Sequence, residues 1–323
     1  MIKVSILVPV YGVEKYIEQC ATTLFGQTYK NIEYVFVDDC SLDKSINILE
    51  TVLNKYPQRK NQVIIIHHQC NRGLGAARKT ALSASTGDFI LNVDSDDYLL
   101  PDAVEKLVNE QKKTGADIIS GAFQYLFNNK LQTKSSCKGI SKQTALKLLL
   151  IQNTIPYNIW GRLIRKSIYS ENGIDAIEGV NMAEDYGLIP RLVFAAESIV
   201  YIDDVIYIYR VSSATSTFSH FEHPHHVISF LKANEAVYQY IHKNDTNGSF
   251  SFPMEIGMLN TYYKAITALF NTKQIMNICH YRPQHLLFRL LHMLFAHRHT
   301  TGLLHHSYLI IKWCYKKKLH YSI

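Results

Sequence analysis

The sequence lacks several features that would each point to a particular class of protein. None of its six cysteines forms a Cys-x-x-Cys pair, which disfavours a thiolate zinc site, and their scatter favours a reducing compartment over a disulfide framework. No apolar run approaches the roughly 18 residues that a membrane-spanning helix needs. No internal repeat or low-complexity linker is present. We therefore expect a globular, cytosolic protein.

Acidic residues are missing from the last part of the chain. Glu255 is the last of them, and residues 256–323 carry nine lysines and arginines. A basic segment rich in Leu, Phe, Tyr and His is typical of regions that bind an anionic surface or partner. No recognised nucleic-acid-binding module accompanies it, so we do not expect a nucleic acid as that partner.

The composition is that of an ordinary globular protein, with 47% hydrophobic and 19% charged residues. A chain of 323 residues has room for one large domain and an accessory region. The apolar run at residues 4–10 is better explained as a first strand than as part of a signal peptide.

Apolar strands and amphipathic helices alternate along the first part of the chain. We expect strands at residues 4–10, 32–37, 63–67, 89–93 and 118–125, and helices at 14–28, 43–55, 75–85 and 101–113. Such alternation predicts an α/β fold with a mostly parallel central sheet and helices on both faces. Beyond about residue 220 helical periodicity dominates. We therefore expect one domain over residues 1–217 and a basic, all-helical C-terminal region over 218–323.

Three carboxylates follow the apolar run at residues 89–93, namely Asp94, Asp96 and Asp97. Carboxylates this close together repel one another unless a cation or hydrogen-bond donors compensate them. Because open α/β sheets bind ligands at the carboxyl ends of parallel strands, the pattern predicts a divalent cation with a phosphate. An acidic turn that caps the next helix is the alternative.

Polar residues also follow two earlier strands. The first strand ends in Pro9-Val10-Tyr11, where proline frees backbone groups from pairing and the tyrosine ring becomes available to a ligand. The second runs into Asp38 and Asp39, and a carboxylate there can accept a hydrogen bond from a nucleobase or a ribose. Ser41 and Asp43, which come next, serve equally well as helix caps.

A partial dinucleotide-binding fingerprint follows the third strand. Gly73-Leu74-Gly75 lies between a strand and a helix, but Arg78 stands where the third glycine is needed, and this is the third strand–helix unit rather than the first. An arginine one turn into a helix suits a phosphate or ribose instead.

Taken in order, these motifs resemble those of the family 2 glycosyltransferases, which have the GT-A fold. The matching segments are Val8-Pro9-Val10-Tyr11, Asp38-Asp39-Cys40-Ser41-Leu42-Asp43, Asn71 with Gly73 and Ala77-Arg78, Asp94-Ser95-Asp96-Asp97, Trp160-Gly161-Arg162-Leu163, Ala183-Glu184-Asp185 and Tyr209-Arg210. The resemblance extends from residue 2 to about residue 217. The chain departs from the family pattern at Cys40, where glycine is usual, and at Gly12, where asparagine is common.

The resemblance implies a donor site for a nucleotide-sugar, usually a UDP-sugar. Nine residues would contact the donor: Pro9, Val10, Tyr11, Asp39, Asn71, Arg78, Asp94, Ser95 and Arg210. The first four would hold the base, Asp94 would lie near the ribose, and Arg210 with a hydroxyl among residues 212–217 would clamp the diphosphate. Asp96 would bind Mg²⁺ or Mn²⁺ that bridges the diphosphate.

By the same resemblance Asp185 would be the general base, which removes a proton from an acceptor hydroxyl in a single inverting displacement. The alternative is that Asp185 is simply an acidic residue at the start of a helix, where the helix dipole favours negative charge. The function expected is an inverting, metal-dependent glycosyltransferase of the hexosyltransferase type that acts in cell-surface polysaccharide synthesis. Two other functions stay open: transfer to a polyprenyl phosphate, and a non-catalytic nucleotide-sugar-binding subunit.

Two interpretations of the basic tail stand side by side. Residues 309–318 combine an apolar stretch, aromatic residues and a lysine cluster, which is typical of helices that lie on anionic bilayers. The enzyme would then be peripheral on the inner face of the cell membrane, near a lipid-linked glycan acceptor. Alternatively, the tail is an accessory helical domain with solvated lysines. The histidine-rich residues 220–226 are better explained as a polar connector than as a zinc site.

Overall fold

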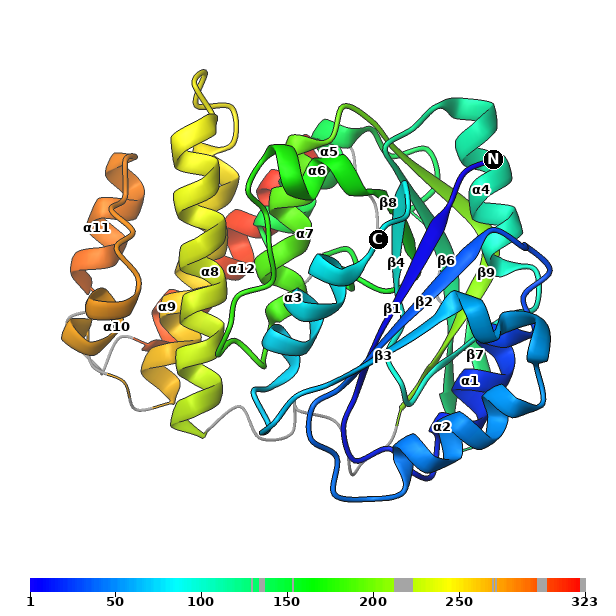
Figure 1. Cartoon of the computed structure of the whole chain (residues 1–323). Helices are drawn as coiled ribbons and strands as arrows, with labels where there is room; N and C mark the ends of the chain where they lie inside the picture. Colours follow the sequence, from blue (N-terminus) through cyan, green and yellow to red (C-terminus); the bar gives the residue numbers. More distant parts are fainter. Residues whose placement is uncertain are drawn as a thin grey trace. The chain divides into compact units, whose positions relative to one another are not determined.

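A computed structural model describes residues 1–128, 130–133, 137–152, 154–211, 223–268, 270, 272–294 and 301–319. The chain forms two compact units, drawn in Figure 1. The first comprises Met1–Ile140, Asn158–Asn181 and Ala195–Ser216, and the second comprises Ser141–Tyr157, Met182–Phe194 and Thr217–Ile323. The chain therefore passes between the units several times, whereas the sequence pattern predicts a single boundary near residue 217.

The first unit is built on a nine-stranded sheet in the order β3-β2-β1-β4-β8-β6-β9-β5, with β7 paired to β6. The strands are β1 (Val4–Val10), β2 (Ile32–Asp38), β3 (Val63–His67), β4 (Phe89–Asn92), β5 (Tyr98–Leu99), β6 (Ile118–Phe127), β7 (Lys130–Thr133), β8 (Arg162–Arg165) and β9 (Ile199–Arg210). Strands β3, β2, β1 and β4 are parallel, and β8 is antiparallel to both of its neighbours. The predicted α/β sheet is confirmed, with a mixed second half.

Helices cover both faces of this sheet (Figure 1). They are α1 (Ile17–Phe25), α2 (Ser45–Asn54), α3 (Leu74–Ala84), α4 (Ala103–Thr114) and the short α6 (Lys166–Glu171), with a 3₁₀ turn η1 (Pro57–Gln62). Alternate residues of β1, from Val4 to Val10, point into a core shared with α1, α2 and α4, as the two-residue period of a strand requires. Helix α3 lies on the other face, against β1 and β2.

The second unit is helical. It contains α5 (Lys142–Leu150), α7 (Glu184–Ala195), α8 (Pro224–Asn244), α9 (Ser251–Thr267), α10 (Thr272–Ile278), α11 (Leu286–Leu294) and α12 (Thr301–Lys318). Helix α9 packs against α5, α8, α11 and α12, and twelve of its 17 residues are buried. At Gly257 an added Cβ would lie 2.1 Å from the Leu150 carbonyl oxygen, so only glycine permits this approach of α9 to α5. The predicted helical C-terminal region is confirmed.

A buried polar network holds α8 and α9 in register inside this unit. The Gln152 amide donates to Asn234 over 2.7 Å and to Thr261 over 3.0 Å, and the Asn260 amide donates to Gln152 over 2.6 Å. Each of these side chains is buried, and such groups are costly unless they are hydrogen-bonded. In the described ranges no helix combines the length and the apolar character needed to cross a membrane.

Candidate active site

Three parallel strands end at the same edge of the sheet. The Asp39 amide donates to the Val10 carbonyl over 2.9 Å, and the Val93 amide donates to the Leu7 carbonyl over 3.0 Å. These bonds continue the pairing of β1 with β2 and β4 one residue beyond the strands. The loops after β1, β2 and β4 therefore begin side by side, at the edge where open α/β sheets bind ligands.

The acidic turn after β4 is held by β9. The Tyr207 hydroxyl donates to the Asp97 carboxylate over 2.7 Å and accepts from the Asp94 amide over 3.1 Å. The Arg210 amide donates to the other Asp97 oxygen over 2.7 Å. Trp160 stacks on the Tyr207 ring, with centroids 4.3 Å apart and planes 14° apart. Asp97 thus fixes the turn through hydrogen bonds to β9, and Trp160 packs on the Tyr207 ring that makes one of them.

Two carboxylates of this turn have a raised pKa. Burial, and then the charge of Asp94, raise the pKa of Asp96 to about 6. Burial and the charges of Asp96 and Asp94 also raise the pKa of Asp97. Clustered carboxylate oxygens of this kind are the ligands that hard divalent cations prefer. Among the described residues, no group of three or more His, Cys, Asp and Glu side chains forms a metal site of its own.

Two guanidinium groups flank the acidic turn. Arg78, on the first turns of α3, is buried and donates to Asp94 over 2.9 Å. Arg210, at the end of β9, donates to the Asp96 carbonyl over 3.0 Å and to Gln19 over 2.5 Å. Guanidinium groups are suited to binding phosphate oxygens. The turn therefore combines carboxylates for a cation with arginines for an anion.

Asp39 organises the turn before α3. Its carboxylate, which is only 3% exposed, accepts from the amides of Arg72 over 2.9 Å and of Gly73 over 2.7 Å. One of its oxygens lies 2.6 Å from His68 Nδ1, and His68 Nε2 lies 2.9 Å from the Thr80 hydroxyl. Asp39 therefore has a structural task, whatever else it contacts.

The backbone explains the two glycines of the partial fingerprint. Gly73 has a φ of +85°, and an added Cβ at Gly75 would lie 2.3 Å from the Ile177 carbonyl oxygen. The first glycine therefore permits the turn, and the second permits close approach of the 177–180 loop. Neither requires a dinucleotide.

The loops after β1 and β2 are tied together. The Gly12 amide donates to the Ser41 hydroxyl over 3.2 Å, and the Ser41 amide donates to Asp38 over 2.8 Å. Cys40 between them has a φ of +62°, in the left-handed region that favours glycine. This backbone conformation explains why glycine is usual at this position in the family 2 glycosyltransferases that the sequence resembles.

The remaining donor-binding candidates divide by exposure. Pro9 and Val10 are buried in β1 and Ser95 is buried in the acidic turn, whereas Tyr11 and Asn71 are exposed. Tyr11 is 52% exposed and follows directly on β1, so its ring is available to a ligand. These assignments stay predictions.

Asp185 lies in the second unit, on the first turn of α7, and is half-buried. Burial, and then the charges of Asp185 and Glu184, raise the pKa of Tyr157 to about 12. The Tyr157 ring packs edge-on against Tyr186, with centroids 5.6 Å apart. Asp185 therefore stands beside a tyrosine that stays protonated at neutral pH. Its role as a base stays a prediction.

Some predicted features fall outside the described residues. The hydroxyls expected at residues 212–217 are among them, as are residues 220–222 of the histidine-rich stretch. Its remaining histidines, His223, His225 and His226, lie at the start of α8.

Sequence reasoning missed Tyr207 as a member of the site. Tyr207 lies far from the acidic turn along the chain, and the only signal for it is the alternation of tyrosines in β9. His68 follows β3 directly, and that place at a strand end predicts a structural role near the donor site, in agreement with its contact to Asp39.

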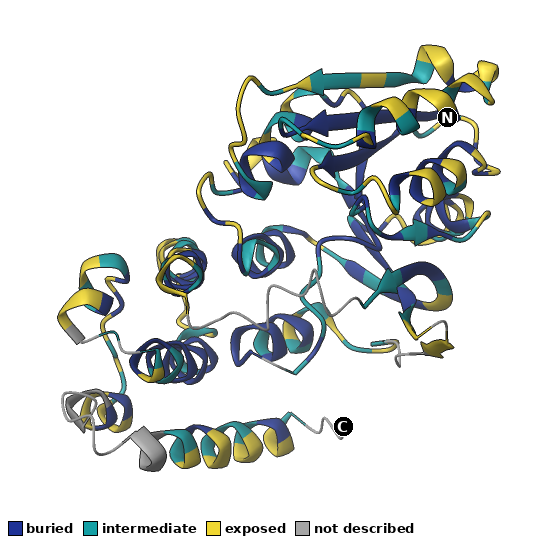
Figure 2. Cartoon of the chain, turned by 90° about the horizontal axis from the view of Figure 1, so that it is seen from below, coloured by how far each residue is buried: buried dark blue, intermediate teal, exposed yellow. Residues whose placement is uncertain are grey.

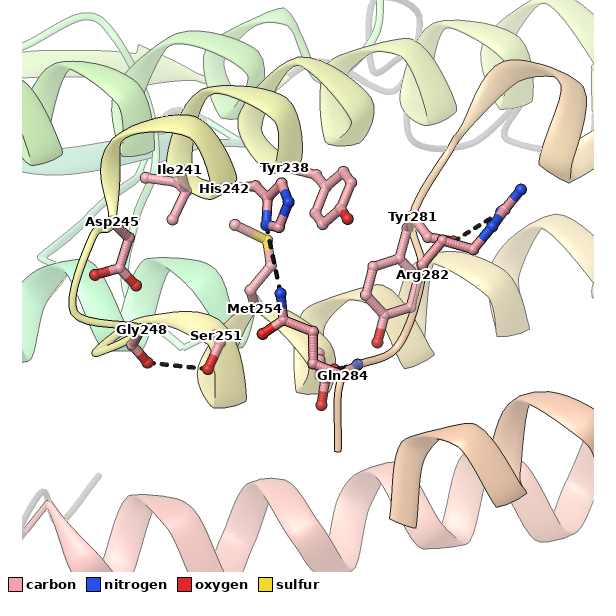
Figure 3. Close-up of a pocket in the computed structure, with 11 residues that line it drawn as sticks. Tyr238, Ile241, His242, Asp245, Gly248, Ser251, Met254, Tyr281, Arg282 and Gln284 are labelled. Carbon is pink, nitrogen blue, oxygen red and sulfur yellow. Dashed lines mark hydrogen bonds between the residues drawn. The ribbon is translucent and has the colours of Figure 1, made fainter. Parts of the chain in front are cut away.

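The second unit contains a small pocket of its own, between the end of α8, the start of α9 and the segment before α11 (Figure 3). Its volume of about 50 Å³ admits water but not a sugar ring. The buried Glu255 carboxylate in its wall accepts from the amides of Gln284 and His285. The pocket therefore lies where Glu255 fixes the backbone that leads into α11.

Known proteins share the family and the fold of this chain. Residues 5–173, more than half of the chain, match the model of Glycosyl transferase family 2. The uncharacterized glycosyltransferase EpsJ of Bacillus subtilis is 30% identical over 219 residues, which are 64% of this chain and 60% of EpsJ. The chain spans between 30% and 60% of the length of the first curated relatives.

Two solved structures illustrate the fold. Staphylococcus aureus TarS 1–349 in complex with UDP-GlcNAc has a TM-score of 0.59 at 20% identity, covering 98% of this chain and 92% of TarS 1–349. The mannosyltransferase PcManGT from Pyrobaculum calidifontis, in complex with GDP-Man and Mn²⁺, has a TM-score of 0.56 at 15% identity, covering 96% of this chain and 85% of PcManGT. The motif order, the strand-end acidic turn and the family match agree, and the chain belongs to Glycosyl transferase family 2.

Proposed function

We propose that this protein is an inverting glycosyltransferase that moves a sugar from a UDP-sugar to a hydroxyl of a glycan acceptor in cell-surface polysaccharide synthesis. The observation that carries the proposal is the acidic turn at the carboxyl edge of the sheet, flanked by Arg78 and Arg210. The complex of TarS with UDP-GlcNAc supports a uridine nucleotide. TarS is named a poly(ribitol-phosphate) β-N-acetylglucosaminyltransferase, which supports a hydroxyl-bearing polymer as acceptor.

The donor nucleotide would lie across the ends of β1, β2 and β4. The exposed Tyr11 and Asn71 would face the base, while Asp39 would keep the turn before α3 in place for it. Asp94, already held by Arg78, would accept from a ribose hydroxyl. Positioning of this kind lowers the entropic cost of reaching the transition state.

Asp96 would hold Mg²⁺ or Mn²⁺, with donor phosphate oxygens completing the coordination. The carboxylate cluster fits such an ion, because burial and then the charge of Asp94 raise the pKa of Asp96, and a cation would favour its ionised form. The complex of PcManGT with Mn²⁺ supports this choice. When bound, the ion neutralises charge on the departing nucleoside diphosphate. Arg210 would add positive charge at the same place.

Asp185 would take the proton of the acceptor hydroxyl as that oxygen attacks the anomeric carbon, on the face opposite the leaving group. A positioned base contributes about 10²–10⁴-fold to the rate. Asp185→Asn should therefore lower kcat by about that factor, whereas Glu184→Gln one residue earlier should not. A polyprenyl-phosphate acceptor needs little deprotonation, so a small effect of Asp185→Asn would favour that alternative.

The donor assignment can be tested by thermal unfolding of the purified protein with UDP, UDP-sugars and GDP-sugars, each with and without Mn²⁺. A ligand at 100 times its dissociation constant stabilises the folded state by about 2.7 kcal/mol. We expect a Mn²⁺-dependent shift with uridine nucleotides that Asp96→Asn abolishes. Asp203→Asn is the matched control, because Asp203 is an exposed carboxylate on β9. No shift with any nucleotide would contradict the donor assignment.

A further inference from the structure

Exposed large hydrophobic side chains are concentrated at the end of the chain. Among the described residues, six of the twelve lie in two helices of the second unit: Leu286, Leu287, Leu290, Leu309, Ile310 and Trp313. Isolated exposed leucines are ordinary on protein surfaces, but a group of them on neighbouring helices marks an interaction surface.

Helix α12 is packed on one side and apolar on its open side. Leu309, Ile310 and Trp313 are 45%, 62% and 57% exposed. With about 100° between successive residues of a helix, these three and Lys317 fall within an arc of about 100°. Figure 2 shows exposed residues along the side of α12 that is turned away from the neighbouring helices. We call these four residues the α12 outer face.

The packed side of α12 contains the side chains that water would normally solvate. Lys316 is 7% exposed, and Tyr308, 2% exposed, donates to the Ile151 carbonyl over 3.2 Å. Lys312 donates to the Tyr308 hydroxyl over 3.1 Å. Burial, and then the charges of Lys316 and Lys264, lower the pKa of Lys312 to about 8. An amphipathic helix in water alone turns its apolar side chains inward, so the exposed Leu309, Ile310 and Trp313 indicate a partner other than water.

Helix α11 lies close to α12. Phe252 of α9 contacts Phe288 of α11 at 5.3 Å and Tyr315 of α12 at 5.6 Å between ring centroids, so the two helices flank the same side chain. Leu286, Leu287 and Leu290 are the exposed residues that α11 contributes.

The charge pattern indicates which partner the surface fits. Residues 256–323 contain nine lysines and arginines and no acidic side chain. Lys317 lies 3.9 Å from the centre of the Trp313 ring, which places a cation and an amphipathic aromatic ring together at the end of the apolar face. Tryptophan and lysine in such an arrangement suit the boundary between lipid headgroups and acyl chains.

We propose that the α12 outer face, extended by the exposed leucines of α11, docks the folded second unit on an anionic lipid bilayer. The apolar residues enter the headgroup boundary, and Lys317 and Lys318 contact lipid phosphates. Helix α12 lies on the bilayer surface as part of a packed unit. One of its sides packs on α9, and the other contacts the lipid. This goes beyond the proposed transfer reaction, because surface binding requires neither donor nor acceptor.

Flotation of the full-length protein with vesicles tests the proposal. Vesicles are made of an equal mixture of phosphatidylcholine and phosphatidylglycerol, or of phosphatidylcholine alone. We expect binding to the first kind, weakened in high salt as headgroup charges are screened. The double variant Leu309→Glu/Trp313→Glu should bind about 100-fold more weakly, and Lys317→Gln and Lys318→Gln about five-fold each. Leu131→Glu in β7, at a leucine that is 52% exposed, should change nothing.

Fluorescence gives a second measurement on the same samples. The chain has two tryptophans, and Trp160 is already 6% exposed in the first unit. A blue shift of the emission on adding anionic vesicles therefore reports Trp313. Trp313→Phe should abolish the shift while flotation persists, because phenylalanine keeps the apolar contact.

Three outcomes would overturn the proposal. They are the absence of binding to the anionic vesicles, equal binding by the double variant, and self-association of the wild type that the double variant abolishes while vesicles have no effect. The last would make the face an interface between two copies. The thermal response of the double variant to uridine nucleotides and Mn²⁺ separates this proposal from the proposed function, because the donor site should remain intact. Equal melting temperatures without ligand exclude misfolding as the cause.

Discussion

Two carboxylates at opposite ends of the parallel strands, Glu33 and Asp96, have pKa values shifted in opposite directions. At the amino end, Glu33 of β2 accepts from Lys3 over 2.7 Å and from Ser5 over 2.6 Å, and the Thr86 hydroxyl donates over 2.6 Å. Burial raises the pKa of Glu33, but these donors outweigh it and lower the pKa to about 2. At the carboxyl end, burial and like charges raise the pKa of Asp96 to about 6.

This difference separates a structural carboxylate from a candidate functional one. Glu33 has donors from two segments of the chain, residues 3–5 and Thr86, and needs no ligand to compensate its charge. Asp96 shares its turn with two other carboxylates, and under the proposed function a positively charged ligand would compensate its charge. A carboxylate whose pKa is raised by burial and by like charges is a candidate for function, whereas one whose pKa is lowered by donors of the fold is explained by its structural pairing.

The largest expected effect comes from removing the negative charge at the carboxyl end. Asp96→Asn should lower the transfer rate by roughly 10³-fold, because a bound metal ion supplies several kcal/mol of charge stabilisation. Its melting temperature without ligand should not fall, since the substitution relieves repulsion among three carboxylates. Kinetics and thermal unfolding of the same preparation measure both. A large loss of stability would place Asp96 with Glu33 among the structural carboxylates.

The converse substitution at the amino end should act on stability alone. Glu33→Gln leaves Lys3 without its charge partner and should lower the free energy of unfolding by about 2–3 kcal/mol. Values of kcat should stay within two-fold in the folded fraction. Glu18→Gln is the matched control: its exposed pair with Lys55 spans 3.5 Å, and such pairs contribute about 0–1 kcal/mol. A selective loss of kcat in Glu33→Gln would contradict the comparison.

Acid should remove the contribution of Glu33 within a defined pH range. Its folded pKa of about 2 lies below the ordinary value of 4.5 for a glutamate, so the stabilisation is present above pH 4.5 and is lost as the pH falls towards 2. The expected loss is about 2–3 kcal/mol, by linkage. Denaturant unfolding from neutral to acidic pH measures it. The difference in unfolding free energy between wild type and Glu33→Gln should shrink over this range; a constant difference would argue against the assigned pKa.

The smallest effect concerns backbone strain at the carboxyl end. Cys40 has a φ of +62°, and Cys40→Gly should raise the free energy of unfolding by about 0.5–1 kcal/mol, because relief of strain exceeds the added entropy of the unfolded chain. Cys70→Gly is the control, since Cys70 is exposed and its φ is not positive. It should be neutral or destabilising. Urea unfolding resolves the two, and equal effects would show that strain at Cys40 is not the cause.

Much of the fold could be predicted because burial leaves a local pattern. The strands β1 to β4 and helices α1 to α4 agree with prediction to within a few residues, since buried strands are continuous apolar runs and their helices are amphipathic. The acidic turn was found because it directly follows such a run. The roles of Asp96 and Asp185 remain predictions.

The sequence by itself determined the α/β class, the family and the residues at the strand ends, because each depends on neighbours along the chain. Tertiary structure decided which partners those residues have. Tyr207 reaches Asp97 only because β9 pairs with β5, which begins directly after Asp97, and Asp39 holds Gly73 only because β2 and β3 are adjacent. Likewise, the order of apolar residues and lysines in α12 does not reveal its inner side. Packing against α9 buries Lys316 and leaves Trp313 exposed. Which side of a helix is buried depends on the elements that pack against it, and its own sequence does not decide this alone.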